Sequence, residues 1–316
     1  MKTITMPGVG GGISQVALGI MRMGNLAQPK CDQALQAALA SGINFFDAAD
    51  IYGRDPELGR GSSEVHFGQA LRHVGVDRER IWLQSKGGIF ADEFDHLTRY
   101  EASQQHLIAA VEGSLRRLHV DYLDFFLIHR LDPLVEPPQV AAAFDALQTS
   151  GKVRHFGVSN CNPRQIELLQ SAVDQPLLVD QLQFGLGHTQ MIDDGLNVNT
   201  ELAATTDGLL EYLRTKQLTL QTWSPFQYGT FAGTFIDQPD FGPLNEVLAR
   251  LAAKYQVTKN AIALAWILRL PMPAQVLIGT MTPAHITASA AGSEVTLMVR
   301  PLLGSRPPTA VEKKAG

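Results

Sequence analysis

The sequence has few cysteines, little excess charge and no long apolar run. Its 316 residues include only Cys31 and Cys161, which argues against a disulfide framework and suits a reducing compartment. The net charge of −5 comes without a basic stripe, so nucleic acid is not an expected partner. The chain lacks both an apolar run of about 18 residues and the apolar segment of a secretory signal. We therefore expect a cytoplasmic protein that does not bind a membrane.

What the chain does contain is a repeated alternation of apolar strands with helices. Eight mostly apolar runs are predicted to be strands, at 16–21, 43–47, 80–86, 122–129, 153–160, 177–181, 218–223 and 276–279. Strands that are apolar almost throughout have both faces covered, which indicates a parallel sheet. Eight strand–helix units favour a closed (β/α)8 TIM barrel, of the α/β class, over an open sheet. The glycine-bearing residues 4–13 precede the first strand and predict an N-terminal β-hairpin.

The rest of the chain suggests no second folded unit. No Gly-x-Gly-x-x-Gly joins a strand to a helix, so a Rossmann domain is not expected. We predict one barrel domain over residues 1–296 and a disordered tail over 297–316, which is rich in Pro and Arg and has no amphipathic period. The polar segment 188–206 lacks the tight spacing of metal ligands, and we interpret it as a loop that shapes a substrate pocket.

Polar residues stand where the predicted strands end. A barrel carries its active site at the C-terminal ends of its strands, and Asp47, Lys86 and His129 occupy three of them. A lysine there needs a partner, and Asp47 is the obvious one. An ammonium group near Tyr52 would lower the pKa of its phenol from about 10 and make it a better acid. The set suits protonation of a carbonyl oxygen while a nicotinamide hydride attacks the carbon.

These residues lie in motifs that together resemble the aldo-keto reductase family, within it the bacterial oxidoreductase branch. The motifs, spread over about residues 16–290, are FDAADIYG, GSSEVHFGQAL, QSKGG, LIHR, GKVRHFGVSN and WSP. The resemblance implies a (β/α)8 barrel that reduces aldehydes or ketones with a nicotinamide coenzyme, usually NADPH. It implies Tyr52 as general acid, Lys86 and Asp47 as the residues that tune it, and His129 as the residue that orients the substrate carbonyl.

The resemblance also implies a coenzyme site. Ser159, Asn160 and Gln181 match positions that hold the nicotinamide carboxamide, and Trp223 matches an aromatic residue that lies against the ring. The remaining matches are Ser224 and Phe226 in the pyrophosphate loop, and Gly279, Thr280, His285 and Ser289 in the adenosine-phosphate site.

Two other functions remain open from the sequence. One is a non-catalytic coenzyme-binding regulatory subunit of the same fold, since related barrels serve potassium channels in that way. The other is an isomerase or aldolase that uses Lys86 as a Schiff-base nucleophile, which would require a neutral lysine. The sequence does not specify the substrate or the oligomeric state, although a monomer is compatible with it.

The adenosine-phosphate site departs from the family pattern in a way that predicts coenzyme preference. His285 stands where the family commonly has an arginine, and a mostly neutral histidine cannot offer a bidentate fork to a phosphate. We expect weaker discrimination for NADPH over NADH than is usual in the family. Titration of both coenzymes measures the preference. A ratio of about 1000 or more, on the order of 4 kcal/mol, would contradict the expectation.

Overall fold

The fold is a closed barrel of eight parallel strands. The computed structural model describes residues 1–91, 98–198, 206–229 and 233–298. Around the barrel the strands follow the order β10-β11-β12-β13-β14-β3-β4-β7. Their bounds are Val16–Gly19 (β3), Phe45–Asp47 (β4), Trp82–Gly87 (β7), Leu123–Ile128 (β10), Val153–Ser159 (β11), Leu177–Gln183 (β12), Thr219–Trp223 (β13) and Ala274–Ile278 (β14). The predicted TIM barrel is therefore confirmed.

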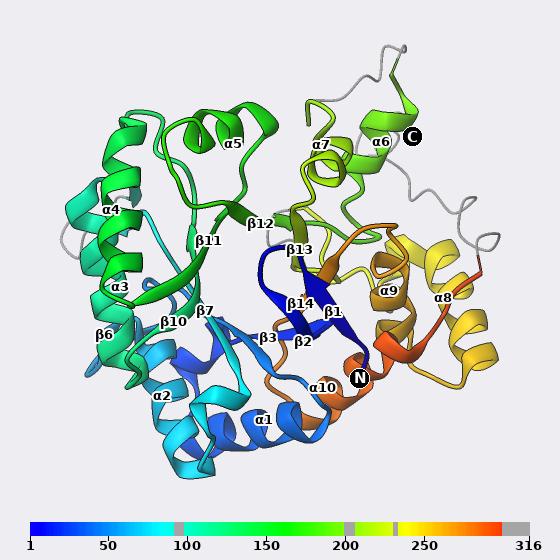
Figure 1. The fold of residues 1–316 in the computed structure, drawn as a ribbon. Helices are drawn as coiled ribbons and strands as arrows, with labels where there is room; N and C mark the ends of the chain where they lie inside the picture. Colours follow the sequence, from blue (N-terminus) through cyan, green and yellow to red (C-terminus); the bar gives the residue numbers. More distant parts are fainter. Residues whose placement is uncertain (92–97, 199–205, 230–232, 299–316) are drawn as a thin grey trace.

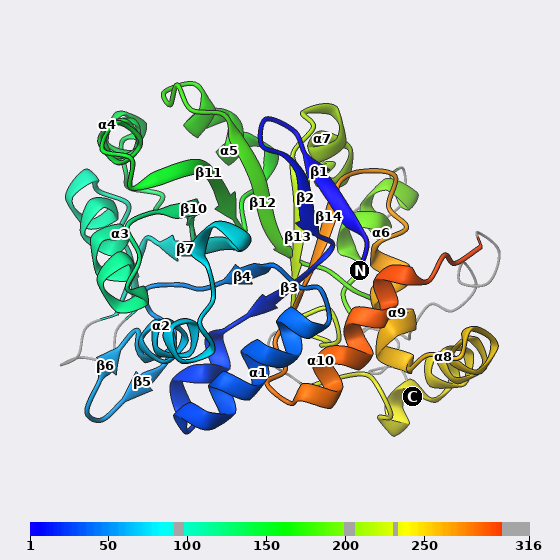
Figure 2. The same cartoon turned by 60° about the horizontal axis from the view of Figure 1, so that its bottom comes forward.

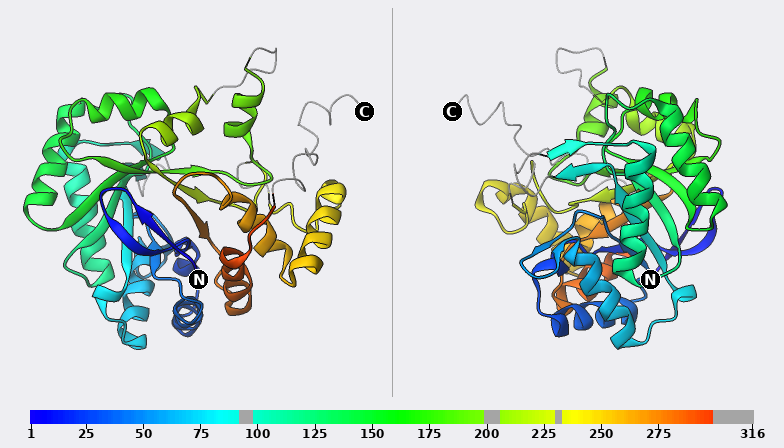
Figure 3. Two further views of the ribbon diagram at one scale, coloured as in Figure 1. Left: turned by 45° about the vertical axis from the view of Figure 1, so that its right-hand side comes forward. Right: turned by 90° about the vertical axis from the view of Figure 1, so that its left-hand side faces the viewer.

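Helices form a ring outside the strands (Figure 1). They are α1 (Gln28–Ala40), α2 (Ser62–Val74), α3 (Gln104–Leu118), α4 (Pro137–Thr149), α5 (Pro163–Gln170), α6 (Gln190–Leu196), α7 (Leu209–Thr215), α8 (Gly242–Tyr255), α9 (Lys259–Ile267) and α10 (Pro283–Ala290). Helix α8 packs on the outside of α9 (Figure 3). None of the helices in the described ranges is long and apolar enough to cross a membrane.

The predicted N-terminal hairpin lies at one end of the barrel. Its strands, β1 (Thr3–Met6) and β2 (Gly10–Ser14), pair antiparallel and lie across the barrel strands (Figure 3). Met6 and Ile13 are fully buried in a cluster with Phe45, Phe125 and Leu127, which come from barrel strands. The hairpin therefore closes the N-terminal end of the barrel with an apolar plug, and the opposite end stays available for a site.

Side chains alternate between the two faces of each barrel strand, as the period of a β-strand requires. On β7, Leu83 belongs to the core beneath the helices, whereas Gln84 and Lys86 bond to residues inside the barrel. Both faces are thus buried, which accounts for the nearly continuous apolar runs in the sequence.

Several local elements differ from the sequence prediction. Helix α6 lies within 188–206, so the prediction of a loop is wrong for Gln190–Leu196, and seven residues carry too little apolar period to reveal such a helix. Two small hairpins were not predicted: β5 (Arg54–Asp55) with β6 (Gly59–Arg60), beside α2 (Figure 2), and β8 (Ile89–Ala91) with β9 (Thr98–Tyr100). The predicted disorder of the tail concerns mainly residues 299–316, which lie outside the described residues.

The loop that carries Tyr52 is held by a close approach between two backbones. The hydroxyl of Ser63 donates to Met21 O at 2.7 Å and accepts from Gly24 N at 3.1 Å, which ties the start of α2 to the loop after β3. Gly53, with φ +78°, lies so near Gly24 that an added Cβ would be 2.8 Å from the Gly24 Cα atom. The Gly53 backbone cannot move away from Gly24 without moving Tyr52, to which it is bonded.

We predict that Gly53→Ala destabilises the protein much more than Gly59→Ala. Gly59 has a similar φ of +72°, but an added Cβ there meets nothing within 4 Å. Gly59→Ala should therefore lower the free energy of unfolding by about 1 kcal/mol, the left-handed backbone term alone. Gly53→Ala should lower it by roughly 3 kcal/mol, because overpacking is added. Urea denaturation of both variants measures the difference, and equal losses would contradict the close approach.

Candidate functional site

A cavity of about 740 Å³ opens at the C-terminal ends of the barrel strands, where a barrel carries its active site. It is within the usual size range of ligand pockets, roughly 300–1,000 Å³. Among the sequence-predicted site residues, those that line the cavity are Asp47, Tyr52, His129, Ser159, Asn160, Gln181, Trp223, Ser224, Phe226, Gly279, Thr280, His285 and Ser289. The remaining one, Lys86, lies fully buried beneath it, bonded to Asp47.

Lys86 and Asp47 form a buried ion pair under the cavity. The ammonium group lies 2.7 Å from both carboxylate oxygens and 2.7 Å from the carbonyl of Ala48. Burial by itself favours the neutral amine, but the Asp47 carboxylate and Tyr52 outweigh it and raise the pKa of Lys86. Lys86 therefore carries its charge at neutral pH.

The phenol of Tyr52 lies between Lys86 and His129. The Lys86 ammonium is 4.9 Å from the centroid of the tyrosine ring, and the imidazole of His129 meets that ring edge-on with the centroids 5.5 Å apart. The expectation that Lys86 lowers the net pKa of Tyr52 is wrong. Burial raises this pKa more than the charge of Lys86 lowers it, and the Asp47 carboxylate raises it further. Tyr52 is accordingly protonated at neutral pH and has a proton to give.

His129 is a neutral imidazole. Burial, together with the charges of Lys86 and Arg130, holds its pKa well below the usual value of 6.5. A neutral imidazole has one N–H donor and one acceptor nitrogen. The Nδ1 atom is buried and has no hydrogen-bond partner among the described residues. The ring can therefore give one hydrogen bond to an oxygen that is placed beside Tyr52.

The ends of β11, β12 and β13, which line the same cavity as Tyr52, form a second polar group. Asn160 donates from Nδ2 to Ser159 Oγ at 2.8 Å and accepts from Trp223 Nε1 at 3.1 Å. Ser159 in turn donates to Gln181 O at 2.8 Å, so residues from three strands are linked. Asn160 and Ser224 both have left-handed backbones, with φ of 56° and 49°, a conformation that clusters at functional sites.

The rear of the Tyr52 loop rests on a buried ionic cluster. Glu64 of α2 bonds to Arg117 of α3 at 2.7 Å and accepts from the Ser85 hydroxyl of β7 at 2.7 Å. Burial and the nearby Glu64 raise the pKa of Asp50 to about 7, although Arg117 opposes the shift. The cluster anchors α2 and α3 to the strand that presents Lys86.

Sequence reasoning missed several polar residues that line the cavity, including Arg22, Arg130, Gln227 and Asn260. Arg22 donates from Nη1 to Gly279 O at 3.3 Å, so a guanidinium lies at the same end of the cavity as Thr280 and His285. The strand before it, β3, ends in Gly19 and offers no polar residue at its last position. The sequence signal for Arg22 was therefore only its place shortly after the first strand.

The lining is suited to a dinucleotide. Ser289 Oγ and Gln227 Oε1 are buried polar atoms that find no partner in the described ranges, so a polar ligand would satisfy them. Helix α10 begins at Pro283, next to the lining residues Thr280 and His285, and the N-terminus of a helix favours a phosphate group. One end of the cavity therefore has aromatic and amide groups, such as Trp223 and Asn160. The other end has the Arg22 guanidinium and the N-terminus of α10.

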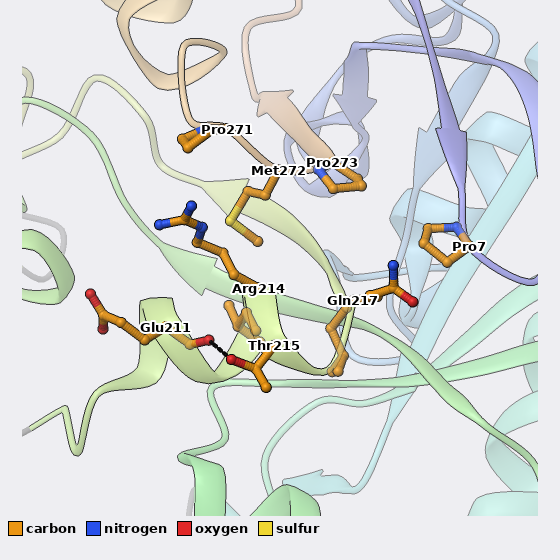
Figure 4. Close-up of a pocket in the computed structure, with 10 residues that line it drawn as sticks. Pro7, Glu211, Arg214, Thr215, Gln217, Pro271, Met272 and Pro273 are labelled. Carbon is orange, nitrogen blue, oxygen red and sulfur yellow. Dashed lines mark hydrogen bonds between the residues drawn. The ribbon is translucent and has the colours of Figure 1, made fainter.

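A second cavity, of about 480 Å³, lies at the opposite end of the barrel. It is lined by Pro7 of the N-terminal hairpin, by Arg214 and by the segment Pro271 to Pro273 (Figure 4). In the chain, Arg214 precedes β13, and Pro271 to Pro273 precede β14. This cavity contains none of the residues that the sequence singled out, and it is at the end of a barrel where residues serve stability.

Comparisons with known proteins place the chain in a family. The model of the Aldo/keto reductase family matches residues 15–299. The 6-dehydroglucose reductase of Agrobacterium fabrum is 33% identical over 293 residues, 90% of each chain. Oxidoreductase YdhF of Escherichia coli is 32% identical over 285 residues, 89% of this chain and 88% of the relative. Among solved structures, an aldo/keto reductase from Klebsiella pneumoniae, in complex with NADP and acetate, is similar in fold with a TM-score of 0.75 at 23% identity, covering 98% of this chain and 96% of its own.

The family match covers most of the chain and all the strand ends that build the cavity. The protein therefore belongs to the aldo-keto reductase family of oxidoreductases.

Proposed function

We propose that this protein reduces aldehydes or ketones to alcohols with NADPH or NADH, and that Tyr52 is the general acid. The observation that carries the proposal is the position of Tyr52. Its phenol faces the cavity between a charged lysine and a neutral histidine. An oxygen atom placed there would meet one acid and one further hydrogen-bond donor, which is what a carbonyl oxygen needs as it gains negative charge.

Each residue around the cavity has its own role in the proposed reaction. When bound, the coenzyme supplies a hydride to the carbonyl carbon. Tyr52 gives its proton to the carbonyl oxygen, and the Lys86 ammonium stabilises the phenolate that remains. Asp47 keeps Lys86 charged and in place. His129 orients the carbonyl oxygen through the one N–H of its neutral ring.

The other residues that line the cavity would bind the coenzyme. Ser159, Asn160 and Gln181 would hold the carboxamide, and Trp223 would lie against the nicotinamide ring. Ser224 and Phe226 belong to the segment that would meet the pyrophosphate. Gly279, Thr280, His285 and Ser289 would surround the adenosine phosphate, with Arg22 as a nearby cation.

The substrate we propose is a small polar carbonyl compound in the cytoplasm. Two relatives at 31–33% identity are named 6-dehydroglucose reductase, so a keto-sugar is the first class to test. The two cysteines are buried and unpaired, as suits a reducing compartment. No nucleic acid, membrane or resident metal takes part in the proposal.

The two competing functions have weaker support. A Schiff-base lysine must be neutral, whereas the Asp47 carboxylate and Tyr52 raise the pKa of Lys86 despite its burial. A coenzyme-binding regulatory subunit needs no proton donor, yet Tyr52, Lys86, Asp47 and His129 lie together at one end of the barrel.

We predict that Tyr52→Phe lowers kcat for carbonyl reduction by about 10³-fold, because only the transferable proton is removed. The dissociation constant of the coenzyme should change by less than about threefold, since the ring stays in place. Tyr100→Phe is the matched control, because Tyr100 lines the same cavity. In the described part of the chain, Tyr100 makes no contact with Lys86 or His129. Equal reduction by wild type and Tyr52→Phe would show that Tyr52 is not the proton donor.

The raised pKa of Tyr52 predicts a flat pH profile. Reduction needs the protonated phenol, so the rate falls only as the pH rises through the pKa of Tyr52. That pKa is raised above 10, and kcat/KM should therefore lose no activity to this group below about pH 9. Initial rates between about pH 6 and pH 9.5 test this, with tryptophan fluorescence to verify that the fold persists. An alkaline midpoint near neutral pH would instead indicate a tyrosine activated by a lowered pKa.

A further inference from the structure

The barrel interior beneath the cavity contains four buried glutamines. They are Gln84 on β7, Gln181 on β12, Gln221 on β13 and Gln275 on β14, and none is more than 2% exposed. Barrel interiors are normally filled by branched apolar residues. A buried amide without partners is costly, so four of them in one layer require an explanation.

The four amides form one hydrogen-bonded chain. At its lower end, Gln275 Nε2 donates to Ser14 O at 2.7 Å, and Gln221 Nε2 donates to Gln275 Oε1 at 2.9 Å. At its upper end, the Nε2 atoms of Gln84 and Gln181 both donate to Gln221 Oε1, at 2.9 and 3.1 Å. The same two Nε2 atoms also donate to Asp47 Oδ1, at 2.6 and 2.9 Å.

The ends of the chain determine which way each amide faces. The Ser14 carbonyl can only accept a hydrogen bond, so Gln275 must turn its nitrogen toward it and its oxygen toward Gln221. The Asp47 carboxylate also only accepts, so Gln84 and Gln181 must turn their nitrogens inward. Both N–H groups of Gln181 are therefore used inside the barrel, and only its Oε1 atom is left for the cavity.

The chain reaches the cavity only through Gln181 and Asp47. Both of these residues line it, whereas Gln84, Gln221 and Gln275 do not. If the Gln181 amide turned over, its oxygen would face two other oxygens, those of Asp47 and Gln221, and two hydrogen bonds would be lost. The glutamines that do not line the cavity thus hold Gln181, which does.

We propose that Gln84, Gln221 and Gln275 are positioning residues, which fix Gln181 so that it presents only a hydrogen-bond acceptor to the cavity. This inference rests on the proposed function. The ligand group it selects is a donor, namely the amino group of a nicotinamide carboxamide. A ring substituent without N–H groups would leave the Gln181 oxygen unsatisfied.

The test compares the oxidised nicotinamide coenzyme with its acetylpyridine analogue, in which a methyl group replaces the amide nitrogen. Calorimetry measures the dissociation constant of each for wild type and for Gln221→Met. Wild type should bind the amide form more tightly. Gln221→Met removes the central link of the chain. The dissociation constant of the analogue divided by that of the amide coenzyme should then fall by about fivefold to tenfold, up to ~1.4 kcal/mol.

Gln175→Met is the matched control. Gln175 is also buried and donates to Asp145 Oδ1 at 2.7 Å and Gln148 Oε1 at 3.2 Å, outside the barrel interior. This variant should keep the wild-type ratio, even if both variants lose thermal stability. Should Gln221→Met fail to fold, Gln275→Met carries the same expectation, because it removes the acceptor that turns the Gln221 oxygen toward Gln181.

The outcomes separate the two proposals. The positioning role would be overturned if folded Gln221→Met kept the wild-type ratio of dissociation constants. It would also be overturned if Gln175→Met lowered that ratio as much as Gln221→Met does. Either result would leave the reductase proposal intact. A wild type that binds neither compound would refute the proposed function and this inference with it.

Discussion

The buried ion pair of Lys86 and Asp47 is the interaction on which the site depends. A fully buried lysine would become neutral without a counter-charge. The barrel supplies one because β4 and β7 are neighbours, with Asp47 opposite Gln84 in the register, so that Lys86 two residues further on reaches the carboxylate. A buried ion pair contributes little net stability compared with apolar residues of the same volume. Its value here lies in keeping a fixed positive charge beside Tyr52.

The interior of the barrel changes character along its axis. Near the hairpin it is apolar, with Met6, Ile13 and Phe125 in one cluster. Above this plug lies the layer of glutamine amides, and above that the ion pair and the cavity. The amide layer adds two hydrogen-bond donors, Gln84 Nε2 and Gln181 Nε2, to the Lys86 ammonium that neutralises the Asp47 carboxylate.

Much of the site was predictable because it follows from the topology. Once eight parallel strands are recognised, their C-terminal ends must meet, and Asp47, His129, Asn160 and Trp223 stand there in the sequence. What could not be predicted depends on three-dimensional surroundings. Burial reversed the expected direction of the Tyr52 pKa, which a nearby lysine alone would lower. Arg22 lines the cavity although its strand ends in glycine.

The sequence by itself therefore determined the barrel, its hairpin and the strand-end residues, since hydrophobic period and residue order are properties of the chain. It did not determine helix α6, whose seven residues carry too short a pattern. Nor did it link Gln84, Gln181, Gln221 and Gln275, which lie on four separate strands. Only the closed tertiary structure brings their amides within hydrogen-bonding distance, because strand curvature and register decide which inward side chains share a layer.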